Sequence, residues 1–294
     1  MSAPKTGHQT AATALIDEAL SLFFESPADL NYTPTTGGVN NVTLRIARTA
    51  AASLSLSAPL GAAEDFILRI YNNGNNSAKV AFEHEILEQL AQQSLSFQVP
   101  RALRSLVAQR AHERLSSGAE CCVFHVIQGR LASTTSPEEV GRAAGELSAA
   151  LGRVQVAASA SPTPPYYRLF EVHHAFGAGA AARDRFYRAL APPLAIASSS
   201  APSADATAAA FPSIDADAAL RESIDDLLAF IRALELRLAA FEAWTLPTTV
   251  IHGDLHYDNV LVVGDTVTAL LDFEFAAVDW RAMELAGTEN YILL

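Results

Sequence analysis

The sequence predicts an α+β fold of two lobes, in which a β-rich N-terminal lobe precedes a mostly helical C-terminal lobe. Strand-like alternation and tight turns fill the chain up to about residue 130, and long amphipathic helical patterns follow. A length of 294 residues, half of them hydrophobic, is enough for one large domain or two lobes. We therefore expect an N-terminal lobe over residues 1–127 and a C-terminal lobe over residues 128–294.

The N-terminal lobe is predicted to combine a first helix with an antiparallel sheet. A helical pattern covers residues 14–24. Residues 35–41, with the sequence Thr-Thr-Gly-Gly-Val-Asn-Asn, form a glycine-rich turn, and the apolar alternation that begins at Val42 indicates a strand. Two apolar runs predict further strands, over residues 66–71 and 121–127.

The helix predicted over residues 79–93 carries one acidic residue in an unusual place. Its apolar residues recur on one face at about 100° per residue, and Glu83 falls in the middle of that face. A buried carboxylate is rare without a cationic partner, because taking its charge out of water is unfavourable. We therefore expect Glu83 to have a cationic partner.

The C-terminal lobe begins with helices and returns to strands near its end. A helix is predicted to begin after Ser136, where a proline and two acids occupy the first turn, and another covers residues 220–241. Between them, residues 191–213 are rich in Ala, Ser and Pro, so we expect a flexible insertion. Three short strands are predicted over residues 249–251, 260–263 and 266–271.

Composition argues against several classes of function. The net charge of −12 disfavours binding to nucleic acid or to acidic membranes. No apolar run is long enough to span a bilayer and the N-terminus shows no secretory signal, so we expect a cytoplasmic protein. The adjacent Cys121 and Cys122 provide neither a disulfide framework nor zinc-ligand spacing, and we expect them to be small buried side chains.

The loop of residues 252–259 gathers polar residues between two short apolar strands, which points to chemistry rather than to packing. Phosphoryl transfer needs one carboxylate to orient the attacking hydroxyl and oxygen ligands to hold Mg²⁺ against the phosphates. Asp254 can supply the first, and Asn259 with Asp272 can supply the second. A hairpin turn at Gly264 should bring Asn259 and Asp272 back together, because the two strands are about equally long.

This region resembles the signature of the aminoglycoside phosphotransferase and choline kinase superfamily, small-molecule relatives of the protein kinases. The resemblance is carried by residues 251–273, and residues 36–41, 66–69 and 271–275 are most similar to the homoserine kinase type II-like branch. It implies a bilobal protein-kinase-like fold, ATP as phosphate donor, Mg²⁺ as cofactor and a small hydroxyl-bearing substrate. Within that resemblance Asp254 matches the catalytic base, and Asn259 and Asp272 match the Mg²⁺ ligands.

The resemblance also assigns residues to nucleotide binding. Gly37, Gly38 and Asn41 match the loop that covers the phosphates. Residues from His125 to Ile127 match the linker between lobes, whose backbone holds the adenine edge; the side chain of His125 is equally well explained as a satisfied strand histidine.

In the family, the helix carboxylate that matches Glu83 pairs with a basic strand residue, usually Lys. This chain has Arg69 there, which keeps the charge but changes the geometry. Asp279 and Glu284 match a segment that we expect to brace the catalytic loop.

Several alternatives stay open from the sequence. One alternative is a metallophosphoesterase, because residues 253–256 match the Gly-Asp-x-His pattern of that class. Such an enzyme needs more metal ligands than the following residues provide. An inactive kinase-like binding protein is a second reading, because of Arg69. The family continues for several helices beyond the position of Leu294, so we expect a C-terminal lobe that is cut short. Homoserine is the first candidate acceptor, with choline, ethanolamine, a methylthio-sugar, a hexosamine or an aminoglycoside as others. A monomer and a dimer are equally compatible with the sequence.

Overall fold

The computed structural model describes residues 6–35, 41–48, 65–132, 137–157, 160–172, 181–190, 218–242 and 244–292. The chain divides into two compact units, each described below by itself. The first combines Met1–Thr163 with Thr249–Leu294, and the second is Pro164–Thr248. Gly37, Gly38 and the predicted insertion over residues 191–213 lie outside the described residues.

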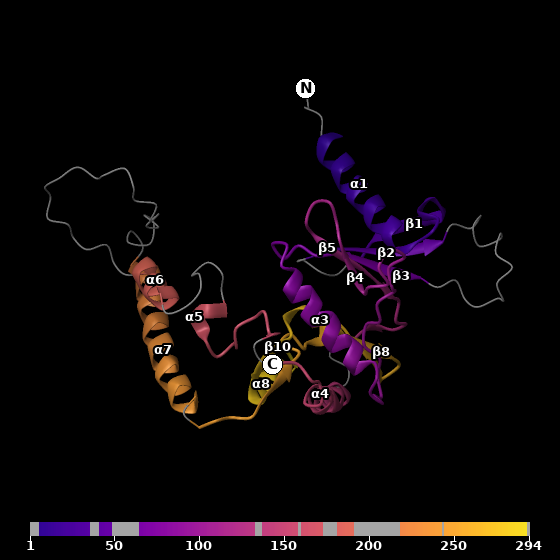
Figure 1. Ribbon diagram of the computed structural model, residues 1–294. Coiled ribbons are helices and arrows are strands. Elements are labelled where there is room, and N and C mark those ends of the chain that lie inside the picture. The colour runs from indigo at the N-terminus through magenta and orange to yellow at the C-terminus, as the bar shows by residue number, and fades with distance from the viewer. Residues whose placement is uncertain are drawn as a thin grey trace, which may run out of the picture. The chain divides into compact units, whose positions relative to one another are not determined.

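The first unit opens with a five-stranded antiparallel sheet in the order β1-β2-β3-β5-β4 (Figure 1). Its strands are β1 (Leu30–Pro34), β2 (Val42–Arg48), β3 (Phe66–Ile70), β4 (His112–Arg114) and β5 (Glu120–His125). Helix α1 (Thr6–Phe23) covers one face, where Leu20 and Phe23 pack with Ile46 and Leu68. Helix α3 (Ser77–Leu90) covers the other, where Ile86 belongs to the same core as Phe124. A helix therefore packs on each face of the sheet.

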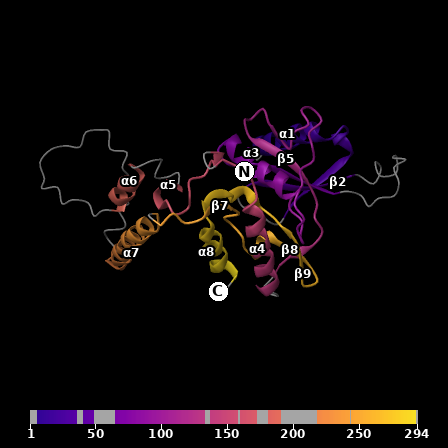
Figure 2. The same cartoon turned by 60° about the horizontal axis from the view of Figure 1, so that its bottom comes forward.

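The rest of the first unit builds short strands between helices. β6 (Arg130–Leu131), β8 (Val260–Val263) and β9 (Thr266–Leu270) form one sheet, and β7 (Thr248–Ile251) pairs with β10 (Ala277–Trp280). Helix α4 (Pro137–Leu151) packs against β9 and against α8 (Arg281–Ile292) (Figure 2). Among the described residues the unit also has the 3₁₀ turns η1 (Pro27–Asp29), η4 (Tyr257–Asn259) and η5 (Phe273–Phe275).

The second unit consists, in its described part, of helices α5 (Leu169–Val172), α6 (Ala181–Leu190) and α7 (Ala218–Glu242). Glu235 of α7 holds α6, because its carboxylate accepts a 2.6 Å hydrogen bond from the Tyr187 hydroxyl and pairs with Arg183 at 2.5 Å. None of the described helices is long and apolar enough to cross a membrane.

The predicted α+β architecture is confirmed, and most predicted elements are present. The helix expected over residues 79–93 begins two residues earlier, because the Asn76 side chain accepts a hydrogen bond from the Lys79 N–H and caps its N-terminus. Strand β4, with the sequence His-Glu-Arg, was not predicted; it is held by pairing with β5 rather than by an apolar pattern.

Candidate active site

Asp254 lies in the loop after β7, and Asn259 holds it in place. The Asn259 amide Nδ2 donates to the Asp254 main-chain oxygen at 2.8 Å and lies 3.1 Å from its carboxylate Oδ2. The same nitrogen is 3.2 Å from His256 Nε2, which is itself 3.5 Å from the Asp254 carboxylate. Two residues that the sequence assigned to different roles are thus brought into direct contact.

His252 fixes the start of this loop through both of its ring nitrogens. The ring is fully buried, its Nε2–H donates to the Leu271 carbonyl at 2.8 Å, and its Nδ1 accepts from the Asp254 N–H at 3.2 Å. Those partners assign a neutral imidazole with its proton on Nε2. Burial lowers the pKa of His252 to about 4, in agreement with that tautomer. One side chain therefore ties Asp254 to the strand end that precedes Asp272.

Glu284 supports the same loop from α8, as the sequence predicted. Its buried carboxylate accepts a hydrogen bond from the His252 N–H. Burial raises the pKa of Glu284 to about 7, although the loop N–H groups act in the opposite direction. Asp279, the other expected brace, is also fully buried, and its carboxylate accepts from the Trp280 N–H at 2.6 Å.

The β8–β9 hairpin brings Asn259 next to Leu271, the residue that precedes Asp272, in the register expected from its strand lengths. Val260 pairs with Leu270, and the Leu271 N–H donates to the Asn259 carbonyl at 2.8 Å. Asp272 follows directly with φ 63° and ψ 67°, in the left-handed region. A non-glycine residue held in this region stores backbone strain, and such strain clusters at functional sites.

Arg69 joins the five-stranded sheet to this hairpin. Its Nη1 lies 3.2 Å from Glu83 Oε1 and 3.1 Å from Asp272 Oδ1. The predicted burial of Glu83 and its pairing with Arg69 are therefore confirmed. The guanidinium also lies over the rings of Tyr71 and Phe124, 5.8 and 5.7 Å from their centroids.

Arg69, Glu83 and Asp272 form a triad in which one cation serves two carboxylates. Burial raises the pKa of Glu83 to about 7, against the lowering effect of Arg69. Burial by itself lowers the pKa of Arg69, but Glu83 and Asp272 outweigh it and raise that pKa above its ordinary value. Arg69 thus stays charged, and it is the ionised form of Glu83 that burial disfavours.

Asn41 is the member of the predicted nucleotide loop that the structure describes. Its Nδ2 donates to Glu274 Oε2 at 2.9 Å, and its Oδ1 accepts from the Asn72 N–H at 3.1 Å. The contact with Glu274 joins the end of the loop to the residues just after Asp272. Glu274 was not assigned a role from the sequence; the only available signal was an acid two positions after Asp272.

The predicted adenine linker lies at the end of β5. The His125 N–H donates to the Arg101 carbonyl at 3.0 Å, and the Val126 N–H donates to the Asp65 carbonyl at 3.1 Å. The His125 ring packs 5.3 Å from that of Phe66. Ile127 makes no main-chain hydrogen bond to the described part of the chain, so its N–H is the one in this stretch that a ligand can use.

The site offers one candidate base and one candidate cation position. Burial raises the pKa of Asp254, while His256 and Asn259 lower it and Asp272 raises it further. Asn259 and Asp272 supply an amide oxygen and carboxylate oxygens. Asp272 Oδ1 lies 3.1 Å from Arg69 Nη1 but is buried with no hydrogen bond from the described residues. These hard oxygen donors fit Mg²⁺, which commonly takes one or two protein carboxylates and completes its shell with water and phosphate. The described residues contain no cluster of three or more His, Cys, Asp or Glu that could hold a metal.

Comparison with known proteins finds a family model that covers most of the chain. The family model described as the phosphotransferase enzyme family matches residues 58–292. Homoserine kinase of Rhodospirillum rubrum is 50% identical over 60 residues, 19% of this chain and 19% of that protein. The match thus spans about a fifth of the length of that curated relative.

Two solved structures show the same fold at low sequence identity. A microcompartment-associated aminopropanol kinase has a TM-score of 0.59 at 14% identity, with 95% of this chain and 74% of that chain covered. The amicoumacin kinase in complex with AMP-PNP, Ca²⁺ and Ami has a TM-score of 0.57 at 12% identity, with 98% and 70% covered. The predicted kinase-like fold is therefore confirmed.

Proposed function

Because the chain belongs to the phosphotransferase enzyme family, we propose that it is an ATP-dependent kinase that phosphorylates a hydroxyl group of a small molecule. One observation carries this proposal. Asn259 holds the Asp254 carboxylate, and the hairpin places Asp272 next to Asn259 and within 3.1 Å of Arg69. This is a base, a cation position and a phosphate-binding cation gathered in one place, which is what phosphoryl transfer requires.

Asp254 is the proposed catalytic base. It would accept the proton of the substrate hydroxyl and orient that oxygen for in-line attack on the γ-phosphate. Its burial raises its pKa and makes it a better proton acceptor than a solvated aspartate, while Asn259 fixes its direction. His252 and Glu284 act through the backbone, by holding the loop that presents Asp254.

Arg69, Asn259 and Asp272 are proposed to hold the phosphates and their cation. Asn259 and Asp272 would bind Mg²⁺, which when bound neutralises charge on the phosphate oxygens. Arg69 already directs Nη1 at Glu83 and Asp272, and its Nε is buried without a partner among the described residues. A guanidinium has five N–H donors, so the unused ones are available to phosphate.

The remaining predicted residues are proposed to hold the nucleotide. Gly37 and Gly38 would cover the phosphates, and Asn41 would anchor that loop through Glu274. The linker from His125 to Ile127 would meet the adenine edge, with the Ile127 N–H, which bonds to no described main-chain carbonyl, as donor.

Homoserine is the first acceptor that we propose. Its support is the local identity to a homoserine kinase, which covers a short part of the chain. The solved relatives act on an aminopropanol and on amicoumacin, as their names state, so other small hydroxyl compounds belong in the same test.

The decisive experiment measures ATP consumption on a panel of small alcohols, homoserine among them, with Mg²⁺ present. Asp254→Asn should lower turnover about a thousandfold on the accepted substrate, within the range for loss of a general base, while Mg-ATP still binds. Asp258→Asn is the matched control, since that acid is in the same loop but 80% exposed. Turnover by Asp254→Asn at the level of this control would contradict the assignment of the base.

A second candidate function is nucleotide binding without transfer, and the contact between Arg69 and Asp272 favours it. The pairing occupies, at 3.1 Å, a carboxylate that the cation position needs. Calorimetric Mg-ATP binding by the wild-type protein, with no turnover of any alcohol in the panel, would establish this alternative.

A further inference from the structure

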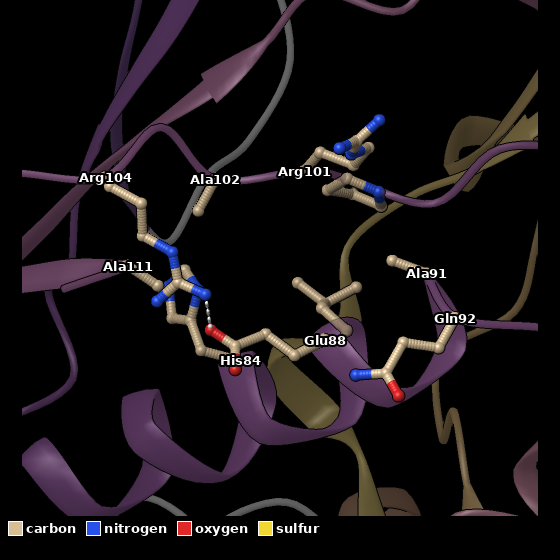
Figure 3. Close-up of a pocket in the computed structure, with 10 residues that line it drawn as sticks. His84, Glu88, Ala91, Gln92, Arg101, Ala102, Arg104 and Ala111 are labelled. Atoms are coloured by element: carbon tan, nitrogen blue, oxygen red, sulfur yellow. Dashed lines mark ion pairs between the residues drawn. The ribbon is translucent and has the colours of Figure 1, made fainter. Parts of the chain in front are cut away.

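A pocket lies outside the candidate active site, between α3 and the segment that leads to β4. It has a volume of about 310 Å³ and is lined by residues of α3, its C-terminal turn, residues 100–104 and Ala111 (Figure 3). None of these residues belongs to the proposed catalytic machinery. The volume is at the lower end of the range for small-molecule sites.

About half of the pocket lining is apolar. Leu87 and Ala91 line it from α3 and its C-terminal turn, while Pro100, Ala102 and Ala111 line it from the other side. Leu87 and Ala111 are buried. A small apolar group in the pocket would therefore be removed from water on two sides, which favours binding.

Polar groups gather at the rim. Figure 3 shows Arg104 reaching across from the 100–104 segment to Glu88 of α3, and the two groups form an ion pair of 2.7 Å. Both side chains are about half exposed, at 51% and 46%, so the pair is held weakly and can exchange partners. Gln92 adds an amide and Arg101 a second guanidinium, which points away from α3 in this view.

His84 connects the pocket to the candidate active site. It lines the pocket yet is only 4% exposed, and its Nε2 lies 3.3 Å from the Tyr71 hydroxyl. The Tyr71 ring lies under the Arg69 guanidinium, and Glu83 precedes His84 on α3. A ligand that contacts His84 is therefore one residue along the helix from the carboxylate that holds Arg69.

The charge of the rim selects the ligand. Burial lowers the pKa of His84 to about 3, so its ring is neutral and contributes no cation. The charged lining residues are two arginines and one carboxylate, of which only Arg104 reaches Glu88, a local positive balance in a chain of net charge −12. An anionic group on an apolar body matches both the rim and the wall, because guanidinium binds carboxylate with two parallel hydrogen bonds.

We propose that this pocket is a regulatory site for a small organic carboxylate, whose apolar body fills the space between α3 and residues 100–104 and whose carboxylate takes Arg104 from Glu88. The bound molecule would fix α3 against the neighbouring segment and keep Glu83 facing Arg69. Occupancy should therefore tighten the binding of Mg-ATP. This effect, but not the binding itself, rests on the proposed function.

Binding is tested without nucleotide, by calorimetric titration of the full chain with benzoate, the neutral isostere benzamide and inorganic phosphate. We expect benzoate to bind more tightly than either of the others, because only benzoate has both the charge and the apolar body. Arg104→Gln should weaken benzoate about tenfold or more, as expected for loss of a charge-assisted hydrogen bond. Glu88→Gln removes the competing carboxylate and should tighten benzoate about two- to fivefold.

Two further variants locate the binding. Ala91→Phe, at an exposed position on the pocket edge, should block benzoate by filling the space. Arg142→Gln is the matched control, because Arg142 forms a comparably exposed ion pair with Glu139 on α4, away from the lining. Benzoate binding that is absent, or that changes in the same direction in Arg104→Gln and Glu88→Gln, would overturn the site.

The regulatory effect is tested by titrating Mg-ATP with and without saturating benzoate. We expect at least a fivefold gain in Mg-ATP affinity and, by thermodynamic reciprocity, the same factor for benzoate when Mg-ATP is present. An unchanged Mg-ATP affinity in the benzoate-bound protein would overturn the regulatory role. A chain that binds benzoate but no Mg-ATP would instead overturn the proposed function, and the regulatory role with it.

Discussion

The two sides of the candidate active site are held by different kinds of interaction. On the sheet side, the charged Arg69 sits between the carboxylates of Glu83 and Asp272. The other side, here called the hairpin side, is the loop of residues 252–259 that leads into the β8–β9 hairpin. There Asp254 is held by neutral groups, the Asn259 amide and the His252 imidazole. One side depends on charge that has been removed from water, and the other on hydrogen bonds with defined directions.

This difference predicts different responses to substitution. A buried ion pair that loses one partner leaves an uncompensated charge, whose free energy is high wherever the group points. A hydrogen-bonded network that loses one bond leaves an unpaired polar group, whose effect is smaller and local. Substitutions on the sheet side should therefore lower the free energy of unfolding more. Substitutions on the hairpin side should have smaller effects, confined to the bond that is lost.

The largest effect is expected from Glu83→Ala. It removes the fully buried partner of Arg69 and leaves only the partly exposed Asp272. The free energy of unfolding should therefore fall by about 3 kcal/mol, the lower end of the range when one member of a buried pair is removed. Urea denaturation followed by circular dichroism measures this change. Mg-ATP affinity should fall as well, because Arg69 loses the partner that fixes its direction.

The control for Glu83→Ala is Arg45→Gln, which breaks the pair between Arg45 and Asp65, whose side chains are 51% and 22% exposed. Exposed pairs contribute little, so its unfolding free energy should change by less than about 1 kcal/mol. Equal losses in the two variants would show that burial does not distinguish the Arg69 pair, and the comparison between the two sides would not hold.

A middle-sized effect is expected at His252, where two substitutions separate its two bonds. Asparagine places a polar atom near the position of Nδ1 and loses the bond to Leu271. Glutamine can reach the position of Nε2 and loses the bond from the Asp254 N–H. Each should lower the unfolding free energy by about 1–3 kcal/mol, the range for an unpaired buried polar group.

The two His252 variants should differ in catalysis more than in stability. Turnover should fall further in His252→Gln, because the bond that is lost there positions Asp254 directly. Identical turnover in both variants, measured by ATP consumption at saturating substrate, would show that His252 supports the loop without orienting the base.

The sequence could predict the site where short-range rules apply. Glu83 was identified from helical spacing, because a periodic apolar face makes an included acid conspicuous. Asn259 and Asp272 were paired because a hairpin has a fixed register once its strands and turn are known. In both cases the deciding residues are close in sequence or in one regular element.

Contacts between distant segments could not be predicted in this way. Asn41 and Glu274 are 233 residues apart and meet through a side-chain hydrogen bond that no periodicity encodes. Strand β4 has a polar sequence and is specified by its neighbour β5. The pocket beside α3 likewise depends on how residues 100–104 pass over the helix, which local propensity does not determine.

The smallest effect is a change in pH dependence on the hairpin side, at Glu284. Its folded pKa of about 7 lies above the ordinary value of 4.5, so the folded state favours the protonated form. The corresponding stability is fully present below about pH 4.5 and is lost as pH rises through about 7. Glu284→Gln cannot ionise and escapes this loss. Its unfolding free energy relative to wild type should therefore rise by about 1–2 kcal/mol between pH 5 and pH 8, measured by urea denaturation. His252 titrates in both proteins, so its contribution cancels in the difference between them. If the difference in unfolding free energy does not change with pH, Glu284 stays ionised in the folded state, and the hairpin side, too, depends on buried charge.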